Sequence, residues 1–358
     1  MIRDAGTAIA PRRPRALAAA LWVLSLAAAR LWADETPSPS PPPSEAPAGR
    51  FDEKVTVERV LMEVRVLDRQ GQPIRGLAPE DLHVTVDGRG VEVESVEWID
   101  VTTPTVVPEG ATQPIAAGRS VVFLFQKDLQ SSHNAGLLRM VRRSRDVVDT
   151  LPALDRVAVV SFDTHLRLWL DLTTNRQRAK EAIERGVVMN RPLAEAAEEA
   201  PALGPLLGPE AARRATSVEK AMRLIGEALA RVPGERSLVL VGSHLGRDLR
   251  NIVGEDYEAA QSALSRARVA VYSLDITEAD HHTLELGMQQ VASDTGGFYA
   301  RTHEFTAQAT DRLRGALEGH YLVSFAKPPG YPGFHEVELR LARGGGTILA
   351  RPGYRDSP

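Results

Sequence analysis

The chain has 358 residues, enough for two domains or for one domain with appendages. Charged residues make up 25% and hydrophobic residues 43%, which is the composition of an ordinary globular protein. Five of the 43 basic residues and only one of the 47 acidic residues lie in the first 33 positions, so the rest of the chain has a net charge of −8. This acidic balance argues against nucleic acid or an anionic membrane as a partner. The absence of cysteine excludes disulfides and thiolate zinc sites.

The N-terminus has the pattern of an export signal. Arginines precede an apolar run over residues 16–29, which is too short to span a membrane comfortably. We expect a signal peptide over residues 1–33, cleaved after Ala29 or Ala33, and a secreted or periplasmic mature protein. A retained membrane anchor is the alternative. The Pro/Ser-rich residues 34–50 are expected to form an extended linker.

Residues 51–117 show the period-two alternation of β-strands. Apolar residues occupy every second position from Val60 to Val66, and Asp87–Gly88 is a strong hairpin signal. The alternation changes phase near Glu94–Ser95, which predicts a β-bulge. A β unit of this size needs further strands to be stable.

Residues 320–358 supply candidate partner strands. Strand patterns occur over 321–325 and 337–341, and after three consecutive glycines residues 347–350 read as the return strand of a hairpin. We expect strands from both ends of the chain to pack as one small antiparallel β-sandwich-like domain. The α/β domain would then be inserted between them in the sequence.

Residues 118–319 have the pattern of an α/β domain. Four short runs are apolar on both faces, and each precedes a segment with helical spacing: 121–125, 157–160, 238–241 and 269–272. Such strands lie between two layers of helices, which predicts a doubly wound, mostly parallel sheet with helices on both faces. Residues 166–172 alternate instead and are expected to form an antiparallel strand at a sheet edge. Residues 187–213, rich in Ala, Pro and Glu, read as an insertion.

The order of these segments resembles the bacterial secreted VWFA-related family, whose members contain a von Willebrand factor A-like domain. The segments that carry the resemblance are Leu67–Gly71, Gly76–Val84, Asp155–Val159, Ala267–Asp275, Ala292–Gly297, His320–Phe325 and Ala350–Tyr354. They extend over nearly the whole mature chain. The resemblance implies a binding site on loops at the carboxyl edge of the sheet.

The resemblance also implies a Mg²⁺ site on three of these loops, with Asp-x-Ser-x-Ser in the first, a Thr in the second and an Asp in the third. A hard divalent cation of this size prefers oxygen ligands in near-octahedral geometry. In the first loop Gln126 replaces the Asp. A shift of two residues fits Asp128 and Ser132 but places Gln130 at the middle Ser. In the third loop His244 stands about where the Asp is expected.

Only the second loop fits the family pattern, through Thr216. Thr216 also opens a capping-box pattern with Glu219, which explains the residue without metal. We therefore expect a degenerate metal-ion-dependent adhesion site and no cofactor. If Mg²⁺ binding survives, Asp128, Ser132 and Thr216 are its weak candidate ligands.

The polar residues of this edge are expected to contact a partner, although ordinary solvated loops are the alternative. The candidates are Asp128, Ser131, Ser132, His133, Thr216, Ser243, His244 and Asp248. Because the insertion at 187–213 leads directly into Thr216, we expect it to overhang the same edge and to supply specificity.

No enzyme signature is evident in the chain. Gly242–Gly246 lacks the spacing of a Gly-x-Ser-x-Gly elbow, and Asp280–His282 lacks a spaced third metal ligand. We therefore predict an exported, non-enzymatic protein-interaction or adhesion-type module that binds a protein or an envelope component. The alternatives are an envelope hydrolase that uses His133, His244 or Asp128, and a weakly Mg²⁺-dependent adhesion domain.

Overall fold

The computed structural model of the chain describes residues 58–100, 118–128, 130–194, 203–246, 255–278 and 285–356. All of them belong to one unit of the chain, Val55–Pro358. The predicted signal peptide and linker lie outside the described residues, as do Asp248 and Asp280–His282, and so do the side chains of Ser131 and Ser132. Within the described ranges, no helix is both long enough and apolar enough to cross a membrane.

A six-stranded sheet forms the centre of the α/β part, in the order β10-β9-β8-β5-β6-β7. Its strands are β5 (Ser120–Gln126), β6 (Arg156–Phe162), β7 (Leu166–Thr173), β8 (Arg236–Gly242), β9 (Val269–Asp275) and β10 (Phe298–Arg301). The four runs predicted as buried strands are β5, β6, β8 and β9, which pair in parallel and are buried along nearly their whole length. At the sheet edge, β7 pairs antiparallel with β6, as its alternation predicts.

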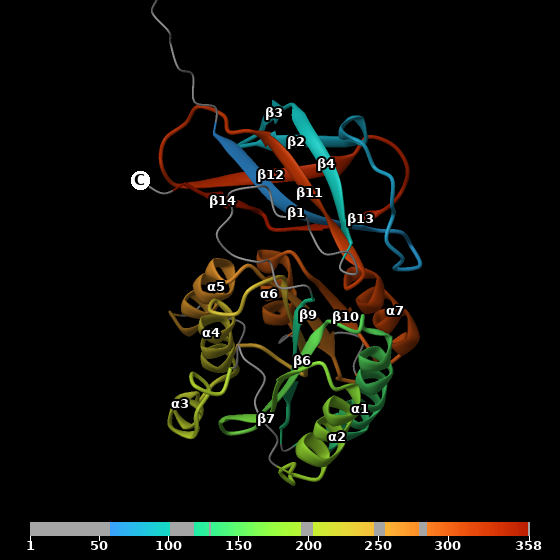
Figure 1. Cartoon of the computed structure of the whole chain (residues 1–358), viewed down its shortest axis with the longest axis vertical. Coiled ribbons are helices and arrows are strands. Elements are labelled where there is room, and N and C mark those ends of the chain that lie inside the picture. Colours follow the sequence, from blue (N-terminus) through green and yellow to red (C-terminus); the bar gives the residue numbers. More distant parts are fainter. Residues whose placement is uncertain are drawn as a thin grey trace, which may run out of the picture. The chain divides into compact units, whose positions relative to one another are not determined.

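Helices cover both faces of this sheet, which confirms the predicted fold class (Figure 1). One face packs against α4 (Val218–Leu229), α5 (Glu255–Arg266) and α6 (Glu285–Thr295). The other packs against α1 (Ser131–Thr150), α2 (Arg176–Glu181), η2 (Ala182–Val188) and α7 (Thr306–Ala316). Apolar side chains at helical spacing, such as Ala221, Met222 and Ile225 of α4, fill the space between helix and sheet.

The described part of the predicted insertion packs against the sheet and contains α3 (Pro209–Arg214). Leu203 and Leu207 are buried against the face that α4 covers. The backbone N–H groups of Leu203 and Gly204 donate to the carboxylate of Asp171 in β7 (2.8 and 2.7 Å). Burial of the two leucines holds this part of the insertion on the sheet, and the expected overhang at the carboxyl edge stays a prediction.

Strands from the two ends of the described chain form two antiparallel sheets around a common core. One sheet has the order β13-β1-β11-β4 and the other β14-β12-β2-β3. Their strands are β1 (Arg59–Leu67), β2 (Leu82–Val86), β3 (Arg89–Val91), β4 (Val93–Asp100), β11 (Gly319–Ala326), β12 (Phe334–Leu341), β13 (Thr347–Ala350) and β14 (Gly353–Arg355), and a 3-10 turn, η1 (Pro79–Asp81), precedes β2. Val64, Tyr321 and Phe325 of one sheet meet Val84 and Val337 of the other in the core. This is the predicted β-sandwich-like domain.

Two local predictions in the β-sandwich are confirmed and one is wrong. Asp87 and Gly88 have positive φ (49° and 76°) and turn β2 into β3, while the pairing of β4 with β11 skips Glu94 as a bulge. Residues 347–350 do not return along β12, because β13 pairs with β1 in the other sheet. Gly344 has φ +83°, a conformation that glycine adopts without strain, and the chain crosses between the sheets there.

A buried ion pair joins the β-sandwich to the α/β part. The Arg65 side chain of β1 is 3% exposed, its Nε donates to the carbonyl oxygen of Ala316 (3.0 Å), and its guanidinium pairs with Glu235. Burial alone would lower the pKa of Arg65 and raise that of Glu235, but nearby opposite charges shift both pKa values the other way, so both groups are charged. Since Glu235 directly precedes β8, this contact lies at the amino edge of the parallel strands.

Candidate functional site

The loops that follow β5 and β8 lie at the carboxyl edge of the parallel strands, opposite the Arg65–Glu235 contact. In open α/β sheets this edge is the usual place for a binding site. We call residues 126–133 and 242–246 the rim. Side chains from one rim loop bond directly to the other.

The side-chain amide of Gln126 ties the two rim loops together. Gln126 is 3% exposed, and its Oε1 accepts the backbone N–H groups of Ser243 (3.0 Å) and His244 (3.2 Å). Its Nε2 lies 3.1 Å from Nε2 of the His244 ring. Residue 242 must be glycine for this arrangement, because a Cβ there would collide with Oε1 of Gln126. Gln126 therefore accepts from two successive backbone donors of the other rim loop and joins the two loops.

Asp128 is the polar centre of the rim. Its Oδ1 accepts the backbone N–H of Gln130 (2.9 Å), and its Oδ2 accepts the Ser243 hydroxyl (2.9 Å) and pairs with Nδ1 of His133. Burial acts to raise the pKa of Asp128, but the bonds from His133, Ser243 and Gln130 outweigh it and hold the pKa below its usual range. The carboxylate is therefore ionised at neutral pH, with donors from both rim loops.

The two polar residues of the third loop differ in what they offer a partner. Ser243 is 2% exposed, and its hydroxyl donates to Asp128 and lies 3.0 Å from Nδ1 of His244. This hydroxyl is used inside the rim. His244 is half-buried, as are His133 and Lys127 of the first loop, so these three side chains reach solvent.

The start of α4 also reaches the rim, through Glu219, which the sequence indicated only as part of a helix cap. Thr216 is exposed, with its hydroxyl 3.4 Å from Nζ of Lys220. The cap of α4 is Ser217, whose side chain accepts the backbone N–H of Lys220 (3.2 Å), so the predicted capping box at Thr216 is wrong by one residue. Glu219 instead accepts the backbone N–H of Gly246 (2.7 Å) and fixes the end of the third loop.

Four of the predicted contact residues meet at the rim: Asp128, His133, Ser243 and His244. Thr216 lies apart, and the remaining three fall outside the described side chains. Gln126 was noted only as a missing ligand, and Glu219 only as part of a cap. Their bonds join segments about a hundred and about thirty residues apart, for which the sequence spacing carries no signal.

Among the rim side chains that the structure describes, the donor groups differ from the oxygen cage that Mg²⁺ prefers. Asp128 and Ser243 bring one carboxylate and one hydroxyl together, but their neighbours are two imidazoles and the amide of Gln126. The Thr216 hydroxyl has an ammonium group beside it. Among the described residues, no three or more His, Asp or Glu side chains are grouped as a metal site would need.

A second polar cluster lies at the end of β9 and along β10. Oδ1 of the buried Asp275 accepts the backbone N–H (2.9 Å) and the hydroxyl (2.8 Å) of Thr277, and its Oδ2 accepts the Tyr299 hydroxyl (2.7 Å). That hydroxyl lies 3.1 Å from Glu285, which also pairs with Arg301 (2.9 Å). Burial has the largest effect on the pKa of Tyr299, and the nearby carboxylates of Asp275 and Glu285 add to it. Together they raise this pKa well above its usual range. The Tyr299 hydroxyl therefore stays protonated and donates its hydrogen bond toward two carboxylates.

No family model matches the chain, and no curated protein matches it. Similar solved structures include the conserved hypothetical protein BatB from Bacteroides thetaiotaomicron (18% identity, 56% of this chain and 98% of that chain, TM-score 0.36). The von Willebrand factor type A protein from Catenulispora acidiphila is also similar (11%, 82% and 73%, TM-score 0.41). So is the vWF domain of the type V pili tip protein Mfa5 from Porphyromonas gingivalis (10%, 56% and 95%, TM-score 0.41).

The arrangement of the chain itself identifies its fold. Helices cover both faces of a sheet whose strands are parallel except for β7 at one edge, and the order of elements agrees with the sequence resemblance. The α/β part has a von Willebrand factor A-like fold. The rim of this VWFA-like domain is the edge at which the resemblance implies a binding site. There the loops are joined by amide, carboxylate and imidazole groups.

Proposed function

We propose that this protein is an exported, non-enzymatic interaction module that binds a protein or envelope partner at the rim without a bound cation. The observation that carries the proposal is the direct bonding of one rim loop to the other through Gln126 and Asp128. A cation in such a site would serve to hold the loops and to offer positive charge to a partner. Here side chains of the protein supply the first of these roles.

Donor groups of the rim are suited to the other role of a cation, which is to offer positive charge to a partner. Lys127, His133 and His244 reach solvent around the Asp128 carboxylate, whose own charge is met by bonds from within the rim. A partner with acceptor oxygens can therefore bond to the rim directly. The loops are already ordered by their mutual bonds, so binding costs little further entropy.

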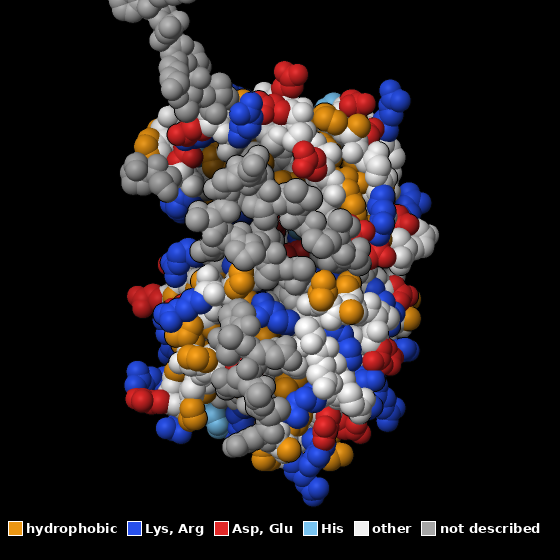
Figure 2. All heavy atoms as spheres, viewed as in Figure 1, with side chains coloured by type: hydrophobic (Ala, Val, Ile, Leu, Met, Phe, Trp, Pro, Cys, Tyr) orange, Lys and Arg blue, Asp and Glu red, His pale blue; other side chains and the backbone are white. Residues whose placement is uncertain are grey.

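The surface charge favours a protein partner over nucleic acid. On the face shown in Figure 2, basic and acidic side chains are interspersed and the hydrophobic ones form small groups. With a net charge of −8 beyond the first 33 residues, the mature chain has no excess of positive charge with which to bind phosphates.

The competing hydrolase interpretation uses His133, His244 or Asp128, and the structure places the Ser243 hydroxyl beside Asp128 and His244 as a candidate nucleophile. A serine nucleophile needs a base that takes its proton, and it needs access for the substrate. The Ser243 hydroxyl instead donates to the Asp128 carboxylate and is 2% exposed. This arrangement supports a binding role for the rim.

The proposal is tested by proximity labelling with the full-length exported protein. The variant Lys127→Glu/His244→Ala changes two solvent-reaching rim side chains and leaves the Gln126 and Asp128 bonds to the backbone in place. Arg340→Glu, at a side chain that is 78% exposed on β12 of the β-sandwich, is the matched control.

We expect partners that label with the wild type and with Arg340→Glu, and that are lost from the rim variant. We also expect no turnover of ester, peptide or phosphate substrates. Equal labelling by the rim variant would contradict the proposal. A hydrolytic activity that disappears in His244→Ala would establish the hydrolase instead.

A further inference from the structure

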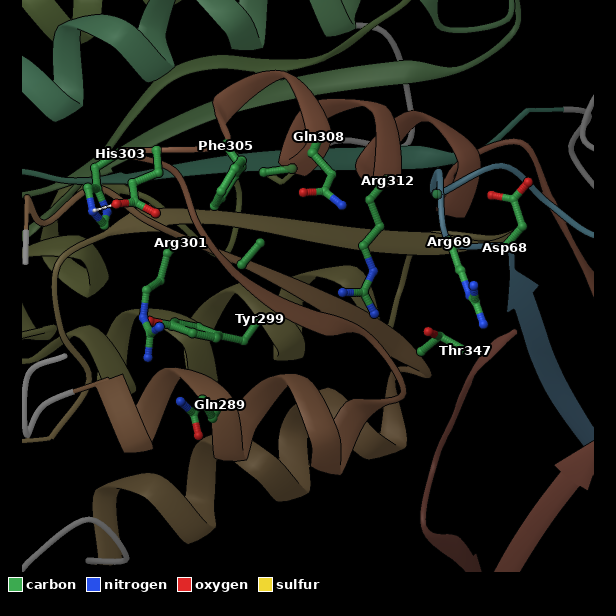
Figure 3. A pocket seen from close by; sticks show the side chains of 14 residues that line it. Asp68, Arg69, Gln289, Tyr299, Arg301, His303, Phe305, Gln308, Arg312 and Thr347 are labelled. Carbon is green, nitrogen blue, oxygen red and sulfur yellow. Dashed lines mark ion pairs between the residues drawn. The ribbon is translucent and has the colours of Figure 1, made fainter. Parts of the chain in front are cut away.

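A groove runs along the free edge of the six-stranded sheet, away from the rim loops that follow β5 and β8 (Figure 3). Its volume is about 800 Å³, and it is lined by β10, by α6 and α7, and by the turn that follows β1. In the part of the chain that the structure describes, β10 has β9 as its only strand neighbour. An edge of this kind offers backbone groups to a further strand.

The backbone of Tyr299 faces the groove. The Thr302 N–H donates to the Asp275 carbonyl of β9 (2.9 Å), so Thr302 and every second residue before it point their backbone groups toward β9. Tyr299 has the opposite phase, and its N–H and C=O point away from β9. An incoming extended chain therefore meets a donor and an acceptor there.

One wall of the groove is a stripe of α7. Gln308, Ala309 and Arg312 line the groove at the spacing i, i+1 and i+4 on one side of the helix, and Phe305, which directly precedes α7, lines it beside them. Figure 3 shows Gln308 and Arg312 on this wall, and Gln289 of α6 on the opposite side. Phe305 is 63% exposed and offers an apolar contact at the start of the stripe.

Two arginines at the far end of the groove have no acidic partner among the described residues. The Arg312 guanidinium lies over the Phe298 ring at 4.5 Å from its centroid, and burial lowers its pKa. Arg69 is exposed on the turn after β1. Asp68 also lines this end of the groove; its carboxylate accepts the backbone N–H groups of Gln70 and Gln72 (2.8 Å each) and forms no ion pair with either arginine among the described residues.

The turn that carries Arg69 is fixed to α7 by a glycine. Gly71 has φ +82°, and a Cβ at this position would lie 2.7 Å from Cα of Arg312. The backbone of the turn therefore packs directly on the backbone of α7. This contact fixes the backbone that carries Arg69 against the backbone that carries Arg312, at one end of the groove.

We propose that this groove binds an extended acidic segment of a partner protein, which adds as a strand to β10 and places a carboxylate between Arg69 and Arg312. The two arginines at the groove end and the outward-facing backbone of Tyr299 together specify the occupant: an extended chain with an acidic side chain. Phe305 and Arg312 are two helical turns apart, roughly 10 Å, which an extended chain covers in about three residues. The segment thus carries an apolar residue two to four positions from the acidic one.

The test selects random 12-residue peptides displayed on phage against the full-length protein. Enriched peptides are then titrated by fluorescence anisotropy against the wild type, Arg69→Gln/Arg312→Gln and the charge-preserving Arg69→Lys/Arg312→Lys. We expect an acidic consensus, a loss of affinity of at least about tenfold with the glutamine variant, and retention within about threefold with the lysine variant. Lys127→Glu/His244→Ala at the rim is expected to bind these peptides as the wild type does.

A second measurement uses only the wild-type protein and does not depend on the variants folding. The best peptide is resynthesised with alternate backbone amides N-methylated, in both phases. One phase is expected to lose at least about tenfold in affinity and the other to lose little, because only one row of amides faces β10. A selection without acidic enrichment, equal binding by the glutamine variant, or equal effects of the two methylation phases would overturn the proposal.

Discussion

Replacement of Gln126 by methionine is expected to loosen the rim by a predictable amount. Methionine keeps most of the side-chain volume but removes the Oε1 that accepts from Ser243 and His244. A buried donor left without a partner costs about 1–3 kcal/mol, and two such donors therefore set a range of about 2–6 kcal/mol. Because His244 is half-buried, we expect water to replace part of its lost bond, and a loss of about 2–4 kcal/mol in the free energy of unfolding.

The assay is urea unfolding followed by circular dichroism, with the midpoint and slope compared between variants. Gln130→Met is the matched control, since Gln130 is exposed and its side chain makes no cap bond to α1. We expect the control to change the free energy of unfolding by less than about 0.5 kcal/mol. If Gln126→Met also lost less than about 0.5 kcal/mol, the amide would not be what joins the rim loops.

Three further predictions concern the rest of the molecule. Gly71→Ala is expected to lower the free energy of unfolding by at least about 2 kcal/mol more than Gly76→Ala does. Both glycines have positive φ (82° and 78°), but only Gly71 has backbone atoms within 3 Å of the position that a Cβ would take. Equal losses in urea unfolding would refute the packing argument. Tyr299→Phe removes a hydroxyl shared by two carboxylates and is expected to cost about 1–3 kcal/mol in the same assay, while an unchanged midpoint would contradict this. The bond to Asp87 raises the pKa of His335, so its stabilisation is present below the unfolded-state pKa of histidine and is lost as the pH rises through the folded-state pKa. Asp87→Asn should therefore destabilise the protein at about pH 5.5 and have no effect by about pH 9, and a pH-independent difference would count against the pair.

The strands of the sheet were predictable because their signal is local. Runs that are apolar on both faces, such as 121–125 and 238–241, have to be buried on both sides, and this requires helices on both faces of the sheet. The hairpin at Asp87–Gly88 was equally local, because only a few residue types adopt positive φ at two successive positions. The bulge near Glu94 followed from a change of phase within one strand.

The features that sequence reasoning missed depend on contacts between distant segments. Residues 347–350 read as a hairpin return, but which sheet they join is decided by β1, almost 300 residues earlier. Thr216 and Ser217 are both acceptable caps, and the packing of α4 selects the second. At the rim, Gln126 was recognised as a departure from the family pattern. Its two bonds to the third loop became visible only in the fold.

The central claim is that the rim is ordered by its own side chains and binds its partner without a cation. Isothermal titration of the purified full-length protein with Mg²⁺ and with Mn²⁺, together with thermal unfolding in the presence of each ion, tests it most directly. We predict no heat of binding and no shift in the unfolding temperature at concentrations up to about 10 mM, since an ion that does not bind the native state cannot stabilise it. A stoichiometric heat of binding, with a rise in unfolding temperature that Asp128→Ala abolishes, would contradict the claim.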